Sequence, residues 1–154
     1  MFFLLCAVTA LQTGCSTIDT LKRLVGLGPE RSALRTLLVS ADPQANQGSA
    51  TALDIVVVYD SAALARLPGT GPEWFRQRAA LQKALATAIE VNSLQVPAAY
   101  PAFQVQLPSG VSSSVAVLAF ANYVAEDGWP AITLTPFKRA SLRLMQESID
   151  VAGS

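Results

Sequence analysis

The stretch LDIVVVYD, residues 53–60, decides the fold of this chain. Apolar side chains occupy alternate positions from Leu53 to Tyr59, so in a strand they all point to one face of a sheet. Asp54 and Asp60 lie at positions of the opposite face, on either side of two valines. A shift of one residue would turn the apolar set outward, so the register of this strand is well specified. The stretch therefore predicts a β-sheet protein.

Similar short segments follow on both sides of this strand. Apolar and polar side chains alternate most regularly in residues 102–108, with Phe103, Val105 and Leu107 on one face. A polar stretch rich in turn formers, DPQANQGSAT at 42–51, separates the first two strands, and EDG at 126–128 is a turn signal. About seven short strands with turns between them predict a mainly β fold, a two-sheet antiparallel β-sandwich. The expected strands are residues 33–41, 53–60, 88–96, 102–108, 111–124, 129–136 and 140–151.

The strand pattern is interrupted by a helical insertion at residues 61–86. Thr70 is placed to cap a helix, with Glu73 three residues later, as in a capping box. The segment that follows carries an apolar stripe, which more often packs on a sheet than binds a ligand. The stripe consists of Trp74, Leu81 and Leu85, with Phe75 beside them.

Composition limits the chain to one domain and excludes several classes of function. The chain has 154 residues, of which 51% are hydrophobic and 14% charged, so a folded core is expected rather than disorder. Eleven basic residues balance eleven acidic ones, so no basic field is available to bind nucleic acid.

The residues that usually carry catalysis are scarce. The chain has no histidine, and its only cysteines are Cys6 and Cys15, which excludes the commonest triads and metal sites. Glu126 and Asp127 are adjacent and expected at a solvated turn, while Asp54 and Asp60 lie about 20 Å apart along one strand.

Neither of the other two candidate groups suggests catalysis. The serines at 112–114 are expected on a strand without a nucleophile elbow, and Lys83 is expected to be exposed. We therefore expect no enzyme activity, no cofactor, no metal and no small-molecule substrate.

The N-terminus looks like a targeting segment. Residues 2–11, FFLLCAVTAL, form an apolar run that is too short to span a bilayer but fits a signal peptide. The following LQTGC resembles the lipobox of bacterial lipoproteins, with Gly14 before Cys15 as the lipidated residue and Ser16 resembling an outer-membrane sorting signal. We expect a signal peptide at 1–14, a lipid-anchored tether at 15–32 and a sandwich domain at 33–154. The alternative is a buried first helix of a cytosolic domain, with Cys15 as a core residue.

The arrangement as a whole resembles the TssJ family, the outer-membrane lipoproteins of type VI secretion systems. The features that carry the resemblance are the lipobox cysteine, SADPQAN after the first strand, VVVYD at the end of the second, a helical insertion with WF and AAL, and the hairpin VAVLAFANYVAEDGWPAITLTP. Two features depart from the family: an extended SLQVPAAYPAF segment, and no basic residue beside Trp129.

This resemblance implies a transthyretin-like sandwich and a structural role. The lipoprotein would face the periplasm from the outer membrane and hold the periplasmic C-terminal domain of the inner-membrane protein TssM. The loop between the first two strands, residues 42–50 here, would contact that partner, through Asp42, Gln44, Asn46 and Gln47. A plain solvated connection is the alternative for this loop.

Two other classes of function stay open from the residues alone. A lipid-anchored carrier of small ligands would use a groove between helix and sheet, with Trp74, Phe75 and Tyr100 as its wall, and would need an apolar pocket of about 300 Å³. A hydrolase would need two or three clustered carboxylates, and a further option is a protein-binding module unrelated to secretion.

Overall fold

The structure is a computed structural model that describes residues 31–125 and 128–154. The expected signal peptide, Cys15, the expected tether up to residue 30 and the acidic pair Glu126 and Asp127 lie outside the described residues. Arg31–Ser154 forms one compact unit. Ser32 is buried in it, and its N–H donates to the carbonyl of Ser114 at 2.9 Å. The folded unit therefore includes two residues that the sequence analysis assigned to the tether.

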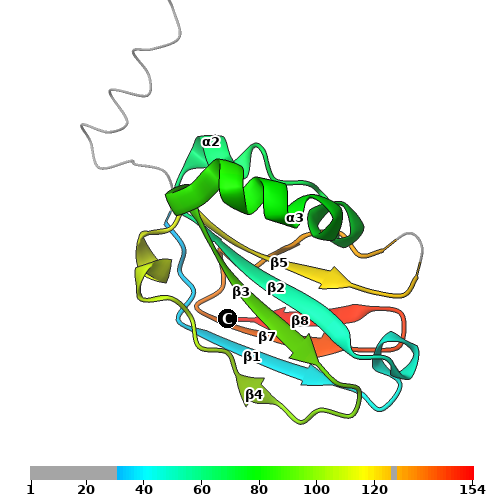
Figure 1. Cartoon of the computed structure of the whole chain (residues 1–154). Helices are drawn as coiled ribbons and strands as arrows, with labels where there is room; N and C mark the ends of the chain where they lie inside the picture. The colour runs from blue at the N-terminus through cyan, green and yellow to red at the C-terminus, as the bar shows by residue number, and fades with distance from the viewer. Residues whose placement is uncertain (1–30, 126–127) are drawn as a thin grey trace, which may run out of the picture. The chain divides into compact units, whose positions relative to one another are not determined.

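Strands dominate the described chain, and both α-helices lie between the second and third strands (Figure 1). In chain order the elements are β1 (Thr36–Ala41), η1 (Ala45–Gly48), β2 (Thr51–Val58), α2 (Ser61–Leu64), α3 (Gly71–Leu85), η2 (Ala86–Ala88), β3 (Ile89–Val96), β4 (Phe103–Gln104), η3 (Ser109–Ser113), β5 (Ala116–Asn122), β6 (Ile132–Thr133), β7 (Arg139–Leu144) and β8 (Ile149–Gly153). No helix within the described ranges is long and apolar enough to cross a membrane.

The strands form two four-stranded sheets, which confirms the predicted β-sandwich. The first sheet has the order β4-β1-β7-β8 and the second the order β3-β2-β5-β6. All neighbours are antiparallel except β1 and β7, which are parallel from the pair Thr36 and Arg139 to the pair Ala41 and Leu144. Only antiparallel pairs were expected from the sequence. No hairpin turn links β1 to β7, so nothing local forces them to run in opposite directions.

Two apolar layers explain why β2 is buried on both faces. Leu53, Ile55 and Val57 pack in the core between the two sheets, as their alternation predicted. Val56 and Val58 pack in a second cluster, between the β3-β2-β5-β6 sheet and the helices that cover its outer face. Trp74, Leu81 and Leu85 belong to this second cluster, so the predicted stripe of α3 does face the sheet.

The caps of the helical insertion follow the sequence pattern closely. The Thr70 hydroxyl accepts the Glu73 N–H at 3.4 Å and donates to the Glu73 carboxylate at 3.1 Å, which fixes the start of α3. Asp60, which was expected on a strand, instead caps α2, and its carboxylate accepts the N–H groups of Ala62 and Ala63 at 2.6 and 3.2 Å.

Four strand predictions need correction. Of residues 129–136, only Ile132 and Thr133 form a strand, β6. Residues 140–151, expected as one strand, form the hairpin of β7 and β8, in which the N–H of Met145 donates to the carbonyl of Ser148 at 2.9 Å. Only Phe103 and Gln104 of residues 102–108 are paired as a strand, although Val105 is buried as predicted. The serines at 112–114 precede β5, two of them in η3, because their side chains favour local turns over a ladder.

Candidate functional site at the loop end of the sandwich

The candidate site lies at the end of the sandwich where β1 and β7 finish, which we call the loop end and define as residues 42–50, 97–102, 123–125 and 145–148. Backbone hydrogen bonds join these connections. The Asp42 carbonyl accepts the Ala99 N–H at 2.9 Å, and the Ala41 N–H donates to the Tyr100 carbonyl at the same distance. Loop 42–50, with η1 within it, follows β1 at this end (Figure 1). The loop is thus fixed to its neighbours rather than separate from them.

Asp42 anchors the start of loop 42–50. Its N–H donates to the Leu144 carbonyl at 2.9 Å, and its carboxylate accepts Nε of Arg143 at 2.8 Å. The hydrogen bond and the charge of Asp42 raise the pKa of Arg143 above its ordinary value. Asp42 is half-buried and Arg143 exposed, so this ion pair orients the loop without being shielded from water.

Asn46 supports loop 42–50 from inside. It is only 2% exposed, and its Oδ1 accepts the N–H of Val124 at 2.7 Å. Its Nδ2 lies 3.4 Å from both the Ala50 and the Asn122 carbonyls, and its own N–H donates to Met145 at 3.1 Å. The side chain therefore ties the loop to β5 and to the β7–β8 hairpin, and its amide groups are already used within the chain.

Gln44 and Gln47 are the exposed members of the four predicted contact residues. Gln47 has φ 57°, between Asn46 with φ 47° and Gly48 with φ 79°. Asparagine and glycine tolerate this left-handed region, whereas glutamine does so at a cost, and such strain persists where surrounding contacts enforce it. Asn46 on the N-terminal side is buried, and the Gln47 side chain is exposed to solvent.

Tyr123 connects the same end to the β7–β8 hairpin. Its hydroxyl lies 3.1 Å from the Met145 carbonyl and 2.9 Å from the Ser148 carbonyl. Burial, with a smaller contribution from the Asp42 charge, raises the pKa of Tyr123 to about 12, although the bond to Met145 opposes this rise. The hydroxyl thus acts as a neutral donor that fixes the hairpin.

A buried polar cluster beneath α3 was not predicted from the sequence. Asp54 is 1% exposed, and its carboxylate accepts Nε1 of Trp74 at 2.8 Å and Nη1 of Arg78 at 3.2 Å. Trp74 stacks on Phe120, with ring centroids 4.9 Å apart. A signal was present in the sequence: Asp54 is a lone acid in an apolar strand, and Trp74 and Arg78 are spaced to share one face of a helix. The cluster fixes the helical insertion to the sheet.

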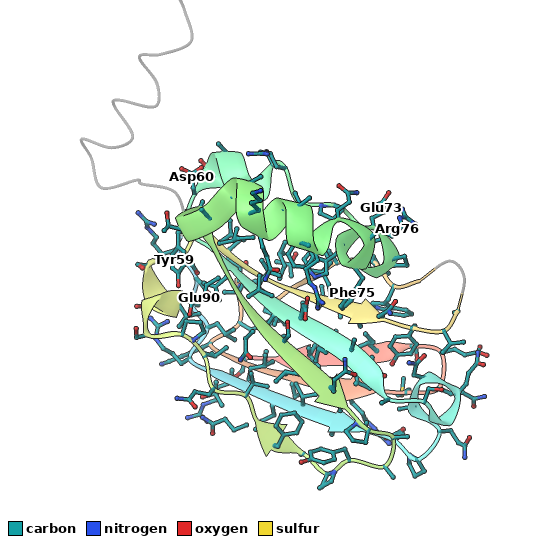
Figure 2. All side chains as sticks on the ribbon, viewed as in Figure 1. Tyr59, Asp60, Glu73, Phe75, Arg76 and Glu90 are labelled. Atoms are coloured by element: carbon teal, nitrogen blue, oxygen red, sulfur yellow. The ribbon has the colours of Figure 1, made fainter. Side chains whose placement is uncertain are left out.

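A second polar pair lies away from α3, where Figure 2 shows Tyr59 near Glu90. The Tyr59 hydroxyl lies 2.9 Å from Oε2 of Glu90, and burial together with this carboxylate raises the pKa of Tyr59 to about 12. An open cleft of about 370 Å³ lies nearby, lined by Glu90, Val91, Asn92, Gln106, Leu107, Pro108 and Ser109. Within the described ranges, no group of three or more His, Cys, Asp and Glu could hold a metal ion.

The aromatic wall proposed for a ligand carrier does not form. Trp74 is fully buried against Phe120 under α3. Tyr100 instead packs edge-on against Phe103, next to the other sheet, with ring centroids 5.3 Å apart. The cleft near Glu90 contains neither Trp74 nor Tyr100 and is lined mainly by polar groups.

The two sheets and the helical insertion form a fold that is also found in solved structures of two type VI secretion proteins. The chain is similar to the structure of Lip from Serratia marcescens, a membrane-bound component of the type VI secretion system, with 11% identity over 77% of this chain and 96% of Lip and a TM-score of 0.53. It is also similar to TssJ1, a type VI secretion lipoprotein of Pseudomonas aeruginosa, with 13% identity over 77% of this chain and 94% of TssJ1 and a TM-score of 0.54. At these identities the likeness confirms the predicted resemblance at the level of the fold. No protein-family model and no curated protein matches the sequence.

Proposed function

We propose that this chain is a lipoprotein of a type VI secretion envelope complex, anchored in the outer membrane through lipid on Cys15 and facing the periplasm. Its sandwich would dock the periplasmic C-terminal domain of a TssM-like inner-membrane protein. The role is structural and involves no catalysis.

The observation that carries this proposal is the fold shared with Lip and TssJ1 over nearly their whole length. The similarity extends over almost all of Lip and TssJ1, because 96% and 94% of those chains are covered. The lipobox-like LQTGC independently favours a lipid anchor, because an apolar run of signal-peptide length precedes Cys15. Fold and anchor signal together favour a tethered docking protein.

The loop end supports the proposed contact surface. Gln44 and Gln47 are exposed and uncharged, and they can donate and accept hydrogen bonds to a partner backbone, as polar interface residues do. Asp42 and Asn46 would act mainly by holding the loop in place, because Asp42 pairs with Arg143 and Asn46 is buried. A loop fixed before binding loses less conformational entropy when the partner docks.

A titration tests the docking role. The fragment 16–154 is added to the C-terminal periplasmic domain of the TssM-like protein from the same organism. The heat of binding or the change in fluorescence anisotropy is measured. We expect a saturable 1:1 complex. No binding at about 1 mM, the weakest affinity worth assigning to a specific complex, would remove the secretion role.

The anchor is tested separately in cells. Cys15→Ser should release the protein from the membrane fraction into the soluble periplasm, since the acyl chains supply about 0.8 kcal/mol per buried CH₂. Cys6→Ser is the matched control and should leave the protein in the membrane fraction. Membrane retention of the Cys15→Ser protein would show that another feature holds it there.

A further inference from the structure

The free edge of β3 stands out among the four sheet edges. The other edge strands are short: β4 and β6 have two residues each and β8 has five. β3 has eight residues, pairs with β2 without a bulge from Ile89 to Val96, and forms the end of its sheet. Soluble proteins usually protect long edges with Lys, Pro or a bulge, and the sequence IEVNSLQV has none of these.

The hydrogen-bonding pattern shows which backbone groups of β3 are available. The Tyr59 N–H donates to the Ala88 carbonyl at 2.9 Å, so the even-numbered residues of β3 exchange hydrogen bonds with β2. The N–H and C=O groups of Val91, Ser93 and Gln95 therefore point outward. No other described residue bonds to them, and the side chains of Ser93 and Gln95 are exposed.

We propose that this edge pairs with the β3 edge of a second copy of the chain, antiparallel about a two-fold axis at Ser93. In this register Ser93 faces Ser93, and Val91 faces Gln95 of the second copy. Every outward N–H and C=O of these residues then gains a partner, because directly opposed residues of a hydrogen-bonded pair exchange both bonds.

Charge and shape favour the second copy as the occupant. Glu90 is the one charged residue of β3, and in this register it faces Val96 of the second copy rather than another carboxylate. The 370 Å³ cleft lies between Glu90–Asn92 of β3 and the segment 106–109, whose Gln106 carbonyl accepts Nδ2 of Asn92 at 3.0 Å. The end of the incoming strand would occupy this cleft. α3 packs more closely on β5 than on β3, so it lies back from the edge (Figure 1). The result is one continuous sheet across two sandwiches.

A cysteine cross-link tests both the edge and its register. The fragment 31–154 contains the whole described fold and no cysteine. In an antiparallel hydrogen-bonded pair the Cα atoms lie about 5.5 Å apart, within the usual span of a disulfide. Ser93→Cys should therefore form disulfide-linked dimers about tenfold faster than Ser49→Cys, which is exposed at the loop end, because pairing raises the local thiol concentration. Equal rates would overturn the proposal.

Sedimentation equilibrium provides the second readout and does not depend on cysteine. The unmodified fragment should show a reversible monomer–dimer equilibrium with a dissociation constant below about 1 mM. This weak affinity suits a small interface. Ser93→Lys places two ammonium groups face to face and should give a monomer, while Ser49→Lys should dimerise like the unmodified fragment. Circular dichroism checks that both variants are folded. A fragment that stays monomeric up to this concentration, or a Ser93→Lys variant that still dimerises, would overturn the proposal.

Discussion

Two aspartate–arginine pairs in this molecule have the same chemistry and differ in what they do. Asp54 and Arg78 join the sheet to α3 at 3.2 Å, and Asp42 and Arg143 join the loop end to β7 at 2.8 Å. The exposed fractions of the side chains are 1% and 41% in the first pair, and 31% and 59% in the second. The longer contact is the more important one for stability, because burial rather than distance sets the cost of losing a polar partner.

The comparison separates the regions that maintain the fold from those that present a surface. The Asp54 carboxylate lies inside the second apolar cluster and also accepts the indole N–H of Trp74. The Asp42 carboxylate lies at the margin of a loop whose exposed glutamines face solvent. A substitution at Asp54 should therefore affect stability, and one at Asp42 or Arg143 should affect the loop.

The largest effect is expected for Asp54→Ala. It leaves the Trp74 N–H buried without an acceptor and should lower the free energy of unfolding by about 2–3 kcal/mol, measured by urea denaturation. Asp54→Asn is the matched control, because it keeps an oxygen for the indole and should cost less. Equal losses for the two variants would show that the charge pair with Arg78, and not the bond to Trp74, dominates.

The fold was predictable from sequence wherever one local pattern decides the outcome. The alternation around Leu53 to Tyr59 fixed both the strand and its inner face, and Thr70 with Glu73 marked the start of α3. Non-local pairing was not predictable in this way. The parallel contact of β1 with β7 joins distant segments, and the turn at Met145 to Ser148 carries no Gly or Pro to mark it.

The candidate site was predictable only in part, for a related reason. The polar, turn-rich sequence 42–50 indicated a loop, but the same pattern cannot say which side chains the loop buries. Asn46 is buried because its amide matches backbone groups of Val124, Asn122 and Ala50, which come from two separate segments. Asp54 was overlooked because its partners Trp74 and Arg78 come from the helical insertion.

An intermediate effect is expected at alkaline pH, from the hydroxyls of Tyr59 and Tyr123. The pKa of Tyr59 and that of Tyr123 are each raised from 10.0 to about 12 in the folded chain. Between these values the unfolded chain binds fewer protons, so the free energy of unfolding should fall as pH rises from about 10 to about 12. The double variant Tyr59→Phe, Tyr123→Phe should show a flatter decline in urea titrations across this range. An unchanged decline would mean that other groups cause it.

The smallest effect on stability is expected for Arg143→Ala. The pair with Asp42 is exposed to water and screened by salt, so the urea midpoint should not change measurably. Arg78→Ala is the matched comparison and should lower the midpoint, because it removes a partner of the buried Asp54 carboxylate. Equal shifts for the two variants would contradict the distinction between a buried and an exposed pair.

The most direct test asks whether the loop end carries the docking contact. The double variant Gln44→Ala, Gln47→Ala is compared with Gln82→Ala, Gln104→Ala, which alters two exposed glutamines on α3 and β4. Both fragments are titrated against the periplasmic domain of the TssM-like protein. We expect the loop variant to bind about tenfold more weakly, the loss of roughly one net hydrogen bond, and the control to bind as the unmodified chain does. Equal affinity for both variants would place the docking surface elsewhere on the sandwich.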